Sequence, residues 1–503
     1  MDLLSNLLHG FAIAVTWQNL LFCGLGVLFG QLVGVLPGIG APTAIALLLP
    51  LTFTMSPTTA IIMLAGIYYG VAYGGTITSV LINVPGESST VMTTLDGYQM
   101  ALQGRAGPAL SIAAIGSFIA GTLSVVLLMS FAPVLARFAL RFGPAEYFGL
   151  TMMAFGLLTV LGGGDPAKII ISTLIGLLMA TMGIDVVSGV PRFAFGVPEL
   201  LGGIDPIVII TGMFGIAEVF NSIEEDVRTD ILKAKFRLRD VFLTWTDWAQ
   251  SRLAIIRGWA IGFIVGILPA GGITTASFLA YLMEKRVSKH PERFGRGAIE
   301  GVAAPESANN AAAISGFAPL LALGLPGSPT TAILLAGFMM WGIRPGPMLF
   351  QTKPDLVWGL IASMYIGNFM LVLMNLFLIP AFVVVLRLPY TILMGLIVVF
   401  STVGAYSANN NLFDVWMMLG LGVLGYLMKK LDYPVVPMIL ALVLGKLAEN
   451  SLRLALTLSG GRMHIFFSRP ISAVFISLAI LAYLFPVIQW AIRGHRRRGP
   501  AQA

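Results

Sequence analysis

Two short motifs of proline, glycine and hydroxyl residues have the chemistry of an anion site. They read Val84-Pro85-Gly86-Glu87-Ser88-Ser89-Thr90 and Leu325-Pro326-Gly327-Ser328-Pro329-Thr330-Thr331. Proline lacks a backbone N–H and glycine adopts unusual dihedrals, so a helix stops at each motif. The hydroxyl residues can cap a new helix, whose free N–H groups and positive dipole end bind anions. The candidate substrate-binding residues are therefore Pro85, Gly86, Ser88, Ser89, Thr90, Pro326, Gly327, Ser328, Thr330 and Thr331.

An ordinary Pro-Gly kink is the alternative interpretation of either motif alone. The motifs, however, occupy matching places in two similar halves, because residues 34–44 resemble residues 266–276. Paired interruptions of this kind indicate the binding site of a transporter built from repeats. Two such helix ends facing each other could hold a di- or tricarboxylate without buried arginines.

The breaks Pro37-Gly38-Ile39-Gly40 and Pro269-Ala270-Gly271-Gly272 expose backbone carbonyl groups. Together with threonine hydroxyls, these carbonyls would form an all-oxygen site suited to Na⁺. Close helix packing through glycine explains the same residues, and the sequence does not separate the two interpretations. The candidate cation-binding residues at the breaks are Gly38, Gly40, Thr43, Gly271, Gly272 and Thr274.

Acidic residues near the breaks are few, which makes each one a functional candidate. Glu306 shares one helix face with Asn309 and Asn310, at spacings of three and four residues. An acid at membrane depth is expected to bind a cation or carry a proton. We assign Glu306 to the cation site and the two asparagines to the substrate site. Asp96 is interpreted as an interfacial residue or a helix cap.

Composition requires these motifs to lie in a membrane protein. Of 503 residues, 57% are hydrophobic and only 11% charged, whereas soluble domains average about 25% charged residues. The net charge of +7 does not indicate nucleic-acid binding, because the basic residues lie between and after apolar segments, as in cytoplasmic loops. One cysteine and four scattered histidines predict neither disulfides nor a zinc site. We expect no cofactor, and no metal ion beyond Na⁺.

We expect an all-α polytopic membrane protein with about 10–12 transmembrane helices, plus re-entrant or broken helices in two inverted repeats. The predicted divisions are a first repeat at 1–220, a polar cytoplasmic connector at 221–252 and a second repeat at 253–503. The basic tail at 493–498 should be cytoplasmic. The apolar window 253–283, split by Pro269, fits either a re-entrant hairpin or a single span.

The motifs resemble the large membrane subunit of the tripartite tricarboxylate transporter family. The matching stretches are 36–53, 66–76, 84–107, 266–272, 304–316 and 324–347. The resemblance implies a secondary transporter of the bacterial inner membrane, coupled to Na⁺ or H⁺. Its partners would be a small four-helix membrane subunit and a periplasmic solute-binding protein that delivers the carboxylate. Glu87-Ser88-Ser89 departs from the Thr-Pro continuation typical of the family, which leaves the substrate open.

Other functional classes fit the sequence less well. Backbone carbonyls at the breaks could also build an ion channel. A membrane-embedded hydrolase is disfavoured because no histidine lies in the apolar body to serve as a base. An ATP-driven pump is disfavoured because no Gly-x-x-x-x-Gly-Lys-Ser/Thr loop is present. We therefore expect a carrier and not an enzyme.

Overall fold

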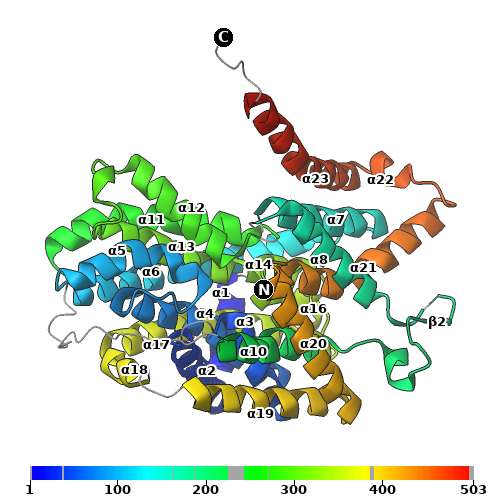
Figure 1. Ribbon diagram of the computed structural model, residues 1–503, viewed down its shortest axis with the longest axis horizontal. Helices are drawn as coiled ribbons and strands as arrows, with labels where there is room; N and C mark the ends of the chain where they lie inside the picture. Colours follow the sequence, from blue (N-terminus) through cyan, green and yellow to red (C-terminus); the bar gives the residue numbers. More distant parts are fainter. Residues whose placement is uncertain are drawn as a thin grey trace. The chain divides into compact units, whose positions relative to one another are not determined.

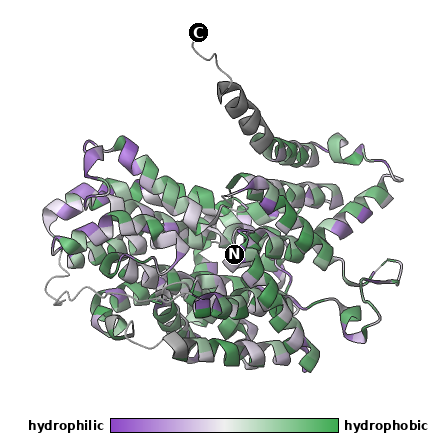
Figure 2. Cartoon of the chain, in the orientation of Figure 1, coloured by the Kyte–Doolittle hydropathy of each residue, from purple (hydrophilic) through white to green (hydrophobic). Residues whose placement is uncertain are grey.

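The computed structural model describes residues 3–36, 39–161, 164–185, 187–224, 243–269, 271–385 and 390–497. Eight of the described helices are long and apolar enough to cross a bilayer, and six shorter apolar helices accompany them. The described strands, β1 (Gly183–Ile184) and β2 (Pro191–Arg192), form one antiparallel pair. The all-α polytopic fold is thus confirmed, and Figure 2 shows that its helices are mostly hydrophobic. Gly38, most of the connector and Arg498 lie outside the described residues.

The chain divides into two compact units, and many of their helices are labelled in Figure 1. Unit 1 comprises Met1–Arg137, Ile207–Leu268 and Gly272–Tyr426. Its helices up to the long α6 are α1 (Leu3–Ala14), α2 (Trp17–Gly34), α3 (Ala41–Leu48), η1 (Leu49–Thr54), α4 (Pro57–Leu81), η2 (Ser88–Thr90), α5 (Val91–Leu102) and α6 (Ala106–Ala139). The next are α9 (Pro206–Ile210), the π-helical segment η4 (Thr211–Ile216), α10 (Ala217–Glu224), α11 (Trp245–Ile267), α12 (Gly272–Val287) and η6 (Pro291–Arg293). The last are α13 (Glu300–Ser315), α14 (Phe317–Leu323), α15 (Pro329–Met340), α16 (Leu349–Thr352), α17 (Pro354–Phe377), α18 (Ile379–Val385), α19 (Tyr390–Asn409) and α20 (Leu412–Lys430).

Unit 2 comprises Phe138–Pro206, Pro269–Gly271 and Leu427–Ala503. Its elements are α7 (Pro144–Leu161), α8 (Pro166–Ala180), the strands β1 and β2, η3 (Pro198–Gly202), α21 (Val435–Leu458), α22 (Ile465–Ser468) and α23 (Pro470–Arg497). Helix α7 packs against α21 and α23, and α21 also packs against α8.

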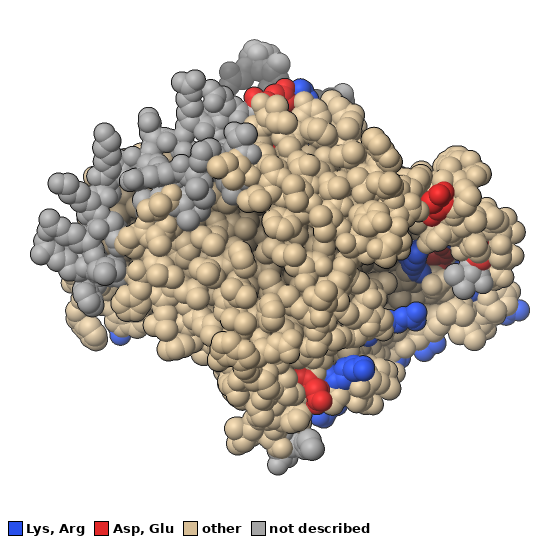
Figure 3. Space-filling view, turned by 90° about the horizontal axis from the view of Figure 1, so that it is seen from below, with Lys and Arg blue, Asp and Glu red and all other residues tan. Residues whose placement is uncertain are grey.

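Helix α4 lies at the core of unit 1. It contains no Asp, Glu, Lys or Arg, and its most apolar window is buried over its whole length. A helix that is hydrophobic all round belongs inside a bundle. The face of the molecule drawn in Figure 3 is largely uncharged, and the charged side chains visible on it lie in small groups.

Helices α2 and α11 pack through matching rows of three glycines. A Cβ added to these glycines would overlap backbone carbonyl oxygens of α4 or α13, so only glycine permits the approach. Gly26, Gly30 and Gly34 of α2 meet Met63, Ile67 and Val71 of α4, and Gly258, Gly262 and Gly266 of α11 meet Ala304, Ala308 and Ala312 of α13. Small residues spaced four apart lie on one face of a helix, which makes a flat contact surface.

The two glycine rows are separated along the chain by the same number of residues as the similar sequences of the two halves. Residue numbers differ by 232 between the two glycine rows, as they do between Pro37 and Pro269. The residues of α4 and α13 whose carbonyl groups contact these glycines differ in number by 241, as Pro85 and Pro326 do. The two halves of the chain therefore build the same helix pair within unit 1, while the predicted repeat boundaries and their inversion stay predictions.

The apolar window split by Pro269 forms two helices that pack against each other. Arg257 of α11 holds Glu284 of α12 through two hydrogen bonds of 2.7 and 2.6 Å. The first arm begins at Trp245, eight residues before the start of the predicted window. This arrangement fits the hairpin interpretation of the window better than one continuous span.

Candidate functional site

The second Pro-Gly motif starts helix α15 with a capping box. The Ser328 hydroxyl accepts a hydrogen bond from the Thr331 backbone N–H at 3.2 Å, and the Thr331 hydroxyl accepts one from the Ser328 N–H at 2.9 Å. Pro329 is the first helical residue, where its missing N–H is harmless. Thr330 is buried beside it. The hydroxyl cap predicted for this motif is thus present.

The first motif uses an acid where the second uses a serine. Glu87 is the N-cap of the turn η2, and its side chain accepts a hydrogen bond from the Thr90 backbone N–H. The Thr90 hydroxyl completes the box by accepting a hydrogen bond from the Glu87 N–H at 3.5 Å. Glu87 is thus the cap of η2, which the sequence prediction did not include. Thr90, one of the predicted capping residues, contributes its hydroxyl to this box and is the N-cap residue of α5, without a side-chain hydrogen bond of its own there.

Each motif reaches a residue of the opposite half of the chain. The Ser88 hydroxyl oxygen lies 2.8 Å from that of Thr274 in α12. The Ser328 hydroxyl oxygen lies 3.4 Å from the phenol oxygen of Tyr68 in α4. No hydrogen bond joins the two motifs directly among the described residues. The two helix starts are thus connected reciprocally, each through a hydroxyl group from the other half.

The two motif glycines lie at corresponding positions but under different steric pressure. A Cβ added at Gly86 would overlap the Gly34 carbonyl oxygen and would lie 2.6 Å from the Gly75 Cα. At Gly327 the nearest atoms are the carbonyl oxygens of Gly266 and Leu268, at 3.2 and 3.4 Å. Gly86 therefore lies against the end of α2 and Gly327 against the end of α11, the two helices that carry the glycine rows. The first motif is the more tightly packed of the two.

Glu306 lies fully inside unit 1, bound by hydroxyl and amide groups. Thr76 donates a hydrogen bond of 2.8 Å to one carboxylate oxygen, and Asn309 donates one of 3.2 Å to the same oxygen. Thr93 donates to the other oxygen. Asn310 donates to the Glu306 backbone carbonyl at 3.2 Å. The shared face predicted for the acid and the two asparagines is present, and first-half threonines complete the cluster.

Glu87 brings a second buried carboxylate to the first motif. One oxygen, Oε2, has no hydrogen-bond partner among the described residues, and the neighbouring Ser89 hydroxyl likewise has none. The side chain accepts a hydrogen bond from the Ala41 N–H at the start of α3. A Cβ added at Gly40 would lie 3.6 Å from Oε1. The acid of the first motif thus lies against the first break, at a positive helix end.

The predicted cation-binding residues are spread over both breaks. Gly40 is the N-cap of α3, and the Thr43 hydroxyl donates a hydrogen bond to the Phe214 carbonyl at 3.3 Å. Gly272 opens α12 with φ of +64°, and Gly271 belongs to the short link before it. None of these residues donates to the Glu306 carboxylate among the described contacts, so their joint role stays a prediction.

Comparison with known proteins decides the family. The family model "Tripartite tricarboxylate transporter TctA family" matches residues 20–440. The chain belongs to the TctA family. It is 46% identical over 496 residues, 99% of this chain and 98% of the relative, to "Uncharacterized 52.8 kDa protein in TAR-I ttuC' 3'region" of Agrobacterium vitis. "Uncharacterized protein in TAR-II ttuC' 3'region" of the same organism is 45% identical over 235 residues, 47% of this chain and 97% of the relative. No solved structure matches.

Membership makes this TctA protein a multi-pass membrane component of a tripartite transporter, which works with other subunits. The resemblance drawn from the motifs is thereby confirmed. The matched region includes both Pro-Gly motifs, both breaks and Glu306.

Asp96 of this TctA chain is an internal anchor, not a helix cap. It lies within α5, completely buried. Oδ1 accepts hydrogen bonds from the backbone N–H groups of Gly295, Gly297 and Ala298 at 2.8, 2.9 and 2.8 Å. Oδ2 accepts one from the Tyr281 hydroxyl at 2.9 Å. The carboxylate thus fixes the basic loop before α13 onto the helix that follows the first motif.

Replacing Asp96 by alanine should destabilise the protein strongly. The change leaves the buried N–H of Ala298 and the partly buried hydrogen bonds of Gly295 and Gly297 without an acceptor, and a buried group that loses its partner costs about 1–3 kcal/mol. Asp96→Asn should be milder, because the amide oxygen still accepts the three backbone hydrogen bonds. The check is the melting temperature of the two purified variants in detergent. Equal melting temperatures for Asp96→Ala and the unaltered protein would contradict the anchor role.

The sequence prediction missed several residues of the site. Thr76 and Thr93 bind Glu306, and Tyr68 contacts Ser328. Thr93 follows the first motif closely, and Thr76 lies within the family-like stretch 66–76. Proximity to a motif was the signal in the sequence that could have identified these threonines. Hydroxyl residues are common in membrane helices, however, and the spacing alone does not distinguish these two.

Proposed function

We propose that the chain is the translocating subunit of a secondary transporter that imports tricarboxylates or related carboxylates across the bacterial inner membrane. Its C-terminus would be cytoplasmic. A periplasmic solute-binding protein would deliver the substrate, and a small four-helix membrane subunit would accompany the chain. The observation that carries the proposal is the reciprocal contact of the two Pro-Gly motifs, Ser88 with Thr274 and Ser328 with Tyr68. Two helix starts from two halves then share one polar region.

The substrate carboxylates would bind at these helix starts. Pro329 has no N–H, and the N–H groups of Ser328, Thr331 and Ala332 are already bonded, so the first turn of α15 offers the Thr330 N–H together with the aligned peptide dipoles of the helix start. Their partial positive charge favours an anion, and hydroxyl groups of Ser88 and Thr330 can donate further hydrogen bonds. Binding by backbone and hydroxyl groups avoids burying a strong positive charge, so the substrate can leave again after translocation.

Cation coupling follows from the two acids. Neither Glu87 nor Glu306 has a lysine or arginine partner in the part of the chain that the structure describes. A buried carboxylate without a counter-charge is costly, and it binds a cation or a proton instead. Glu87 would also repel an anionic substrate beside it. Neutralisation of the acids by Na⁺ or H⁺ would therefore accompany substrate binding, which is symport.

The direct test is uptake of radiolabelled citrate into proteoliposomes containing this chain and its small membrane partner. Binding protein and an inward Na⁺ or proton gradient are each added or omitted. We expect saturable uptake that needs both additions. Uptake of a different carboxylate under the same requirements would change only the substrate. Passive, non-saturating flux would contradict the carrier and support an ion channel.

The contact between Ser88 and Thr274 gives a more local prediction. Ser88→Ala and Thr274→Ala should each raise the KM for uptake severalfold, because the hydroxyl–hydroxyl hydrogen bond that both changes remove is worth about 0.5–1.5 kcal/mol. The double variant should be little worse than either single one, because both changes remove the same contact. Thr94→Ala, which removes a hydroxyl bonded only within α5, is the control and should leave the KM unchanged. Additive effects of the two changes would contradict a shared role.

A further inference from the structure

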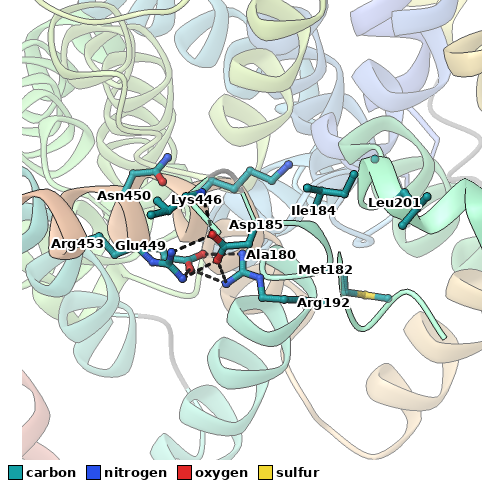
Figure 4. Close-up of a pocket in the computed structure, with 12 residues that line it drawn as sticks. Ala180, Met182, Ile184, Asp185, Arg192, Leu201, Lys446, Glu449, Asn450 and Arg453 are labelled. Carbon is teal, nitrogen blue, oxygen red and sulfur yellow. Dashed lines mark hydrogen bonds and ion pairs between the residues drawn. The ribbon is translucent and has the colours of Figure 1, made fainter. Parts of the chain in front are cut away.

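Helix α21 carries a charged face in the middle of a membrane-length apolar helix. Lys446, Glu449, Asn450 and Arg453 recur at spacings of three and four residues, so they lie on one side of α21. They face the segment around the β1–β2 hairpin, and together with it they line a cavity of about 100 Å³ in unit 2 (Figure 4). Ionisable groups within an apolar helix long enough to cross a bilayer are candidates for a functional site. The Pro-Gly motifs belong to unit 1, so this cavity is a separate site.

Two acids and two arginines at this cavity neutralise each other. Arg192 holds Glu449 through two hydrogen bonds of 2.6 and 3.2 Å, and Arg453 lies 2.7 Å from both Glu449 and Asp185. The Ser188 backbone N–H and the Arg453 guanidinium hold the pKa of the Asp185 carboxyl well below its usual range. Asp185 therefore stays ionised near neutral pH, and the oxygens of both acids are already occupied by donors.

Lys446 is the remaining charged side chain of the cavity, outside the pairs that the two acids form with the two arginines. Its amine has no hydrogen-bond or ion-pair partner among the described residues, and in Figure 4 no dashed line reaches it. It lies beside the backbone of Gly203, where an added Cβ would be 3.8 Å from Nζ. The Nε–H of Arg192 is buried and also lacks an acceptor in the described part of the chain. The groups at the cavity that lack a hydrogen-bond partner are thus donors. The formal charges of the side chains that line it add up to +1.

The cavity has room for a small polar ligand. One water needs about 10–15 Å³ on a comparable measure, so a volume of about 100 Å³ accepts several waters or one oxyanion group. Apolar residues such as Met182, Ile184 and Leu201 form the remaining wall. Lys446 and Asn450 are exposed, so an anion can reach both side chains.

We propose that this cavity in unit 2 binds an oxyanion, a carboxylate or phosphate group, with Lys446 as its counter-charge. Asn450 lines the same cavity and can supply an amide donor. The oxyanion has two possible sources, a soluble anion or the headgroup of an anionic lipid. The proposal does not depend on the transport function of unit 1, because it concerns binding alone.

The test uses the purified full-length protein and its melting temperature. In the first arm, inorganic phosphate is titrated against chloride at constant ionic strength in a neutral detergent. In the second arm, nanodiscs containing phosphatidylglycerol are compared with nanodiscs of phosphatidylcholine alone. We expect a saturable rise in melting temperature in one arm, and which arm responds identifies the soluble or the lipid source. No rise in either arm would overturn the proposal.

Matched variants locate the effect. Lys446→Gln should weaken the apparent affinity by about tenfold or more, as expected for loss of a charge-assisted hydrogen bond, and Lys446→Arg should retain it. Lys168→Gln is the control in the same unit, because Lys168 donates to the Leu431 carbonyl at 2.7 Å and lies outside the cavity. If Lys446→Gln does not fold, Asn450→Ala leaves the ion pairs intact and should weaken binding severalfold. An unchanged affinity in the folded Lys446 or Asn450 variant would overturn the proposal.

Discussion

Replacement of Glu306 by glutamine is expected to abolish the response of uptake to the coupling cation. Glutamine fits the space and keeps one oxygen acceptor for Thr76, Thr93 or Asn309, but it carries no charge to neutralise. Uptake at a saturating cation gradient should fall by about tenfold or more, since an interaction with a buried charge is worth about 1.5–3 kcal/mol. The remaining uptake should be the same with and without the gradient.

The measurement is initial uptake in proteoliposomes at graded Na⁺ and at graded pH. Loss of the Na⁺ response identifies Na⁺ as the ion that neutralises Glu306, and loss of the pH-gradient response identifies H⁺. Glu306→Asp should keep part of the response, because the charge remains while the shorter side chain loses contact with its donors. Glu292→Gln removes an exposed acid and is the control for charge alone.

A structural role for Glu306 would give a different pattern. Asn310 binds the backbone of Glu306 and the Ser117 hydroxyl, so the cluster also joins α13 to α6. If that joining were the whole role, Glu306→Gln would lower the melting temperature while the cation response of the folded fraction stayed normal. That result would contradict the assignment of Glu306 to the cation site.

Much of the fold could be predicted because its determinants are local. Apolar length and the absence of charge predict membrane helices, and Pro-Gly pairs predict where they stop. The breaks before Gly40 and before Gly272 fall where the sequence places them. The register between halves also needs only local pattern, since each glycine row repeats every four residues.

The partners of the acids could not be predicted, because they are distant in sequence. Thr76 and Thr93 lie 230 and 213 positions from Glu306, and no local pattern in either segment indicates the pairing. Helix α21 shows the same limit. The apolar run of the sequence is interrupted by charged residues from Lys446 onward, but α21 continues to Leu458. Its charged face can continue the helix because Asp185 and Arg192 of the hairpin segment pair with it.

Alanine at Gly86 is expected to disrupt the protein far more than alanine at Gly327. The new methyl group at Gly86 would overlap the Gly34 carbonyl oxygen and press on Gly75 and on the Thr78 hydroxyl, at 2.6 and 2.7 Å. Backbone atoms of packed helices cannot move aside cheaply, and overpacking of this kind costs about 1–3 kcal/mol or more. We expect a marked loss of folded protein in detergent and of uptake.

Gly327→Ala is the matched control, because it makes the same change at the corresponding place in the other half. Its methyl group would lie 3.2 and 3.4 Å from the nearest carbonyl oxygens, so a shift of a few tenths of an ångström accommodates it. The folded yield should stay near that of the unaltered protein, and any loss of uptake in this variant then reports on the site itself. Equal loss of folded protein in both variants would contradict the asymmetry between the motifs. That asymmetry predicts different roles for the two motifs. The second motif, which has the hydroxyl cap and the less tightly packed glycine, can adjust around a bound anion. The first motif is fixed between α2 and α4.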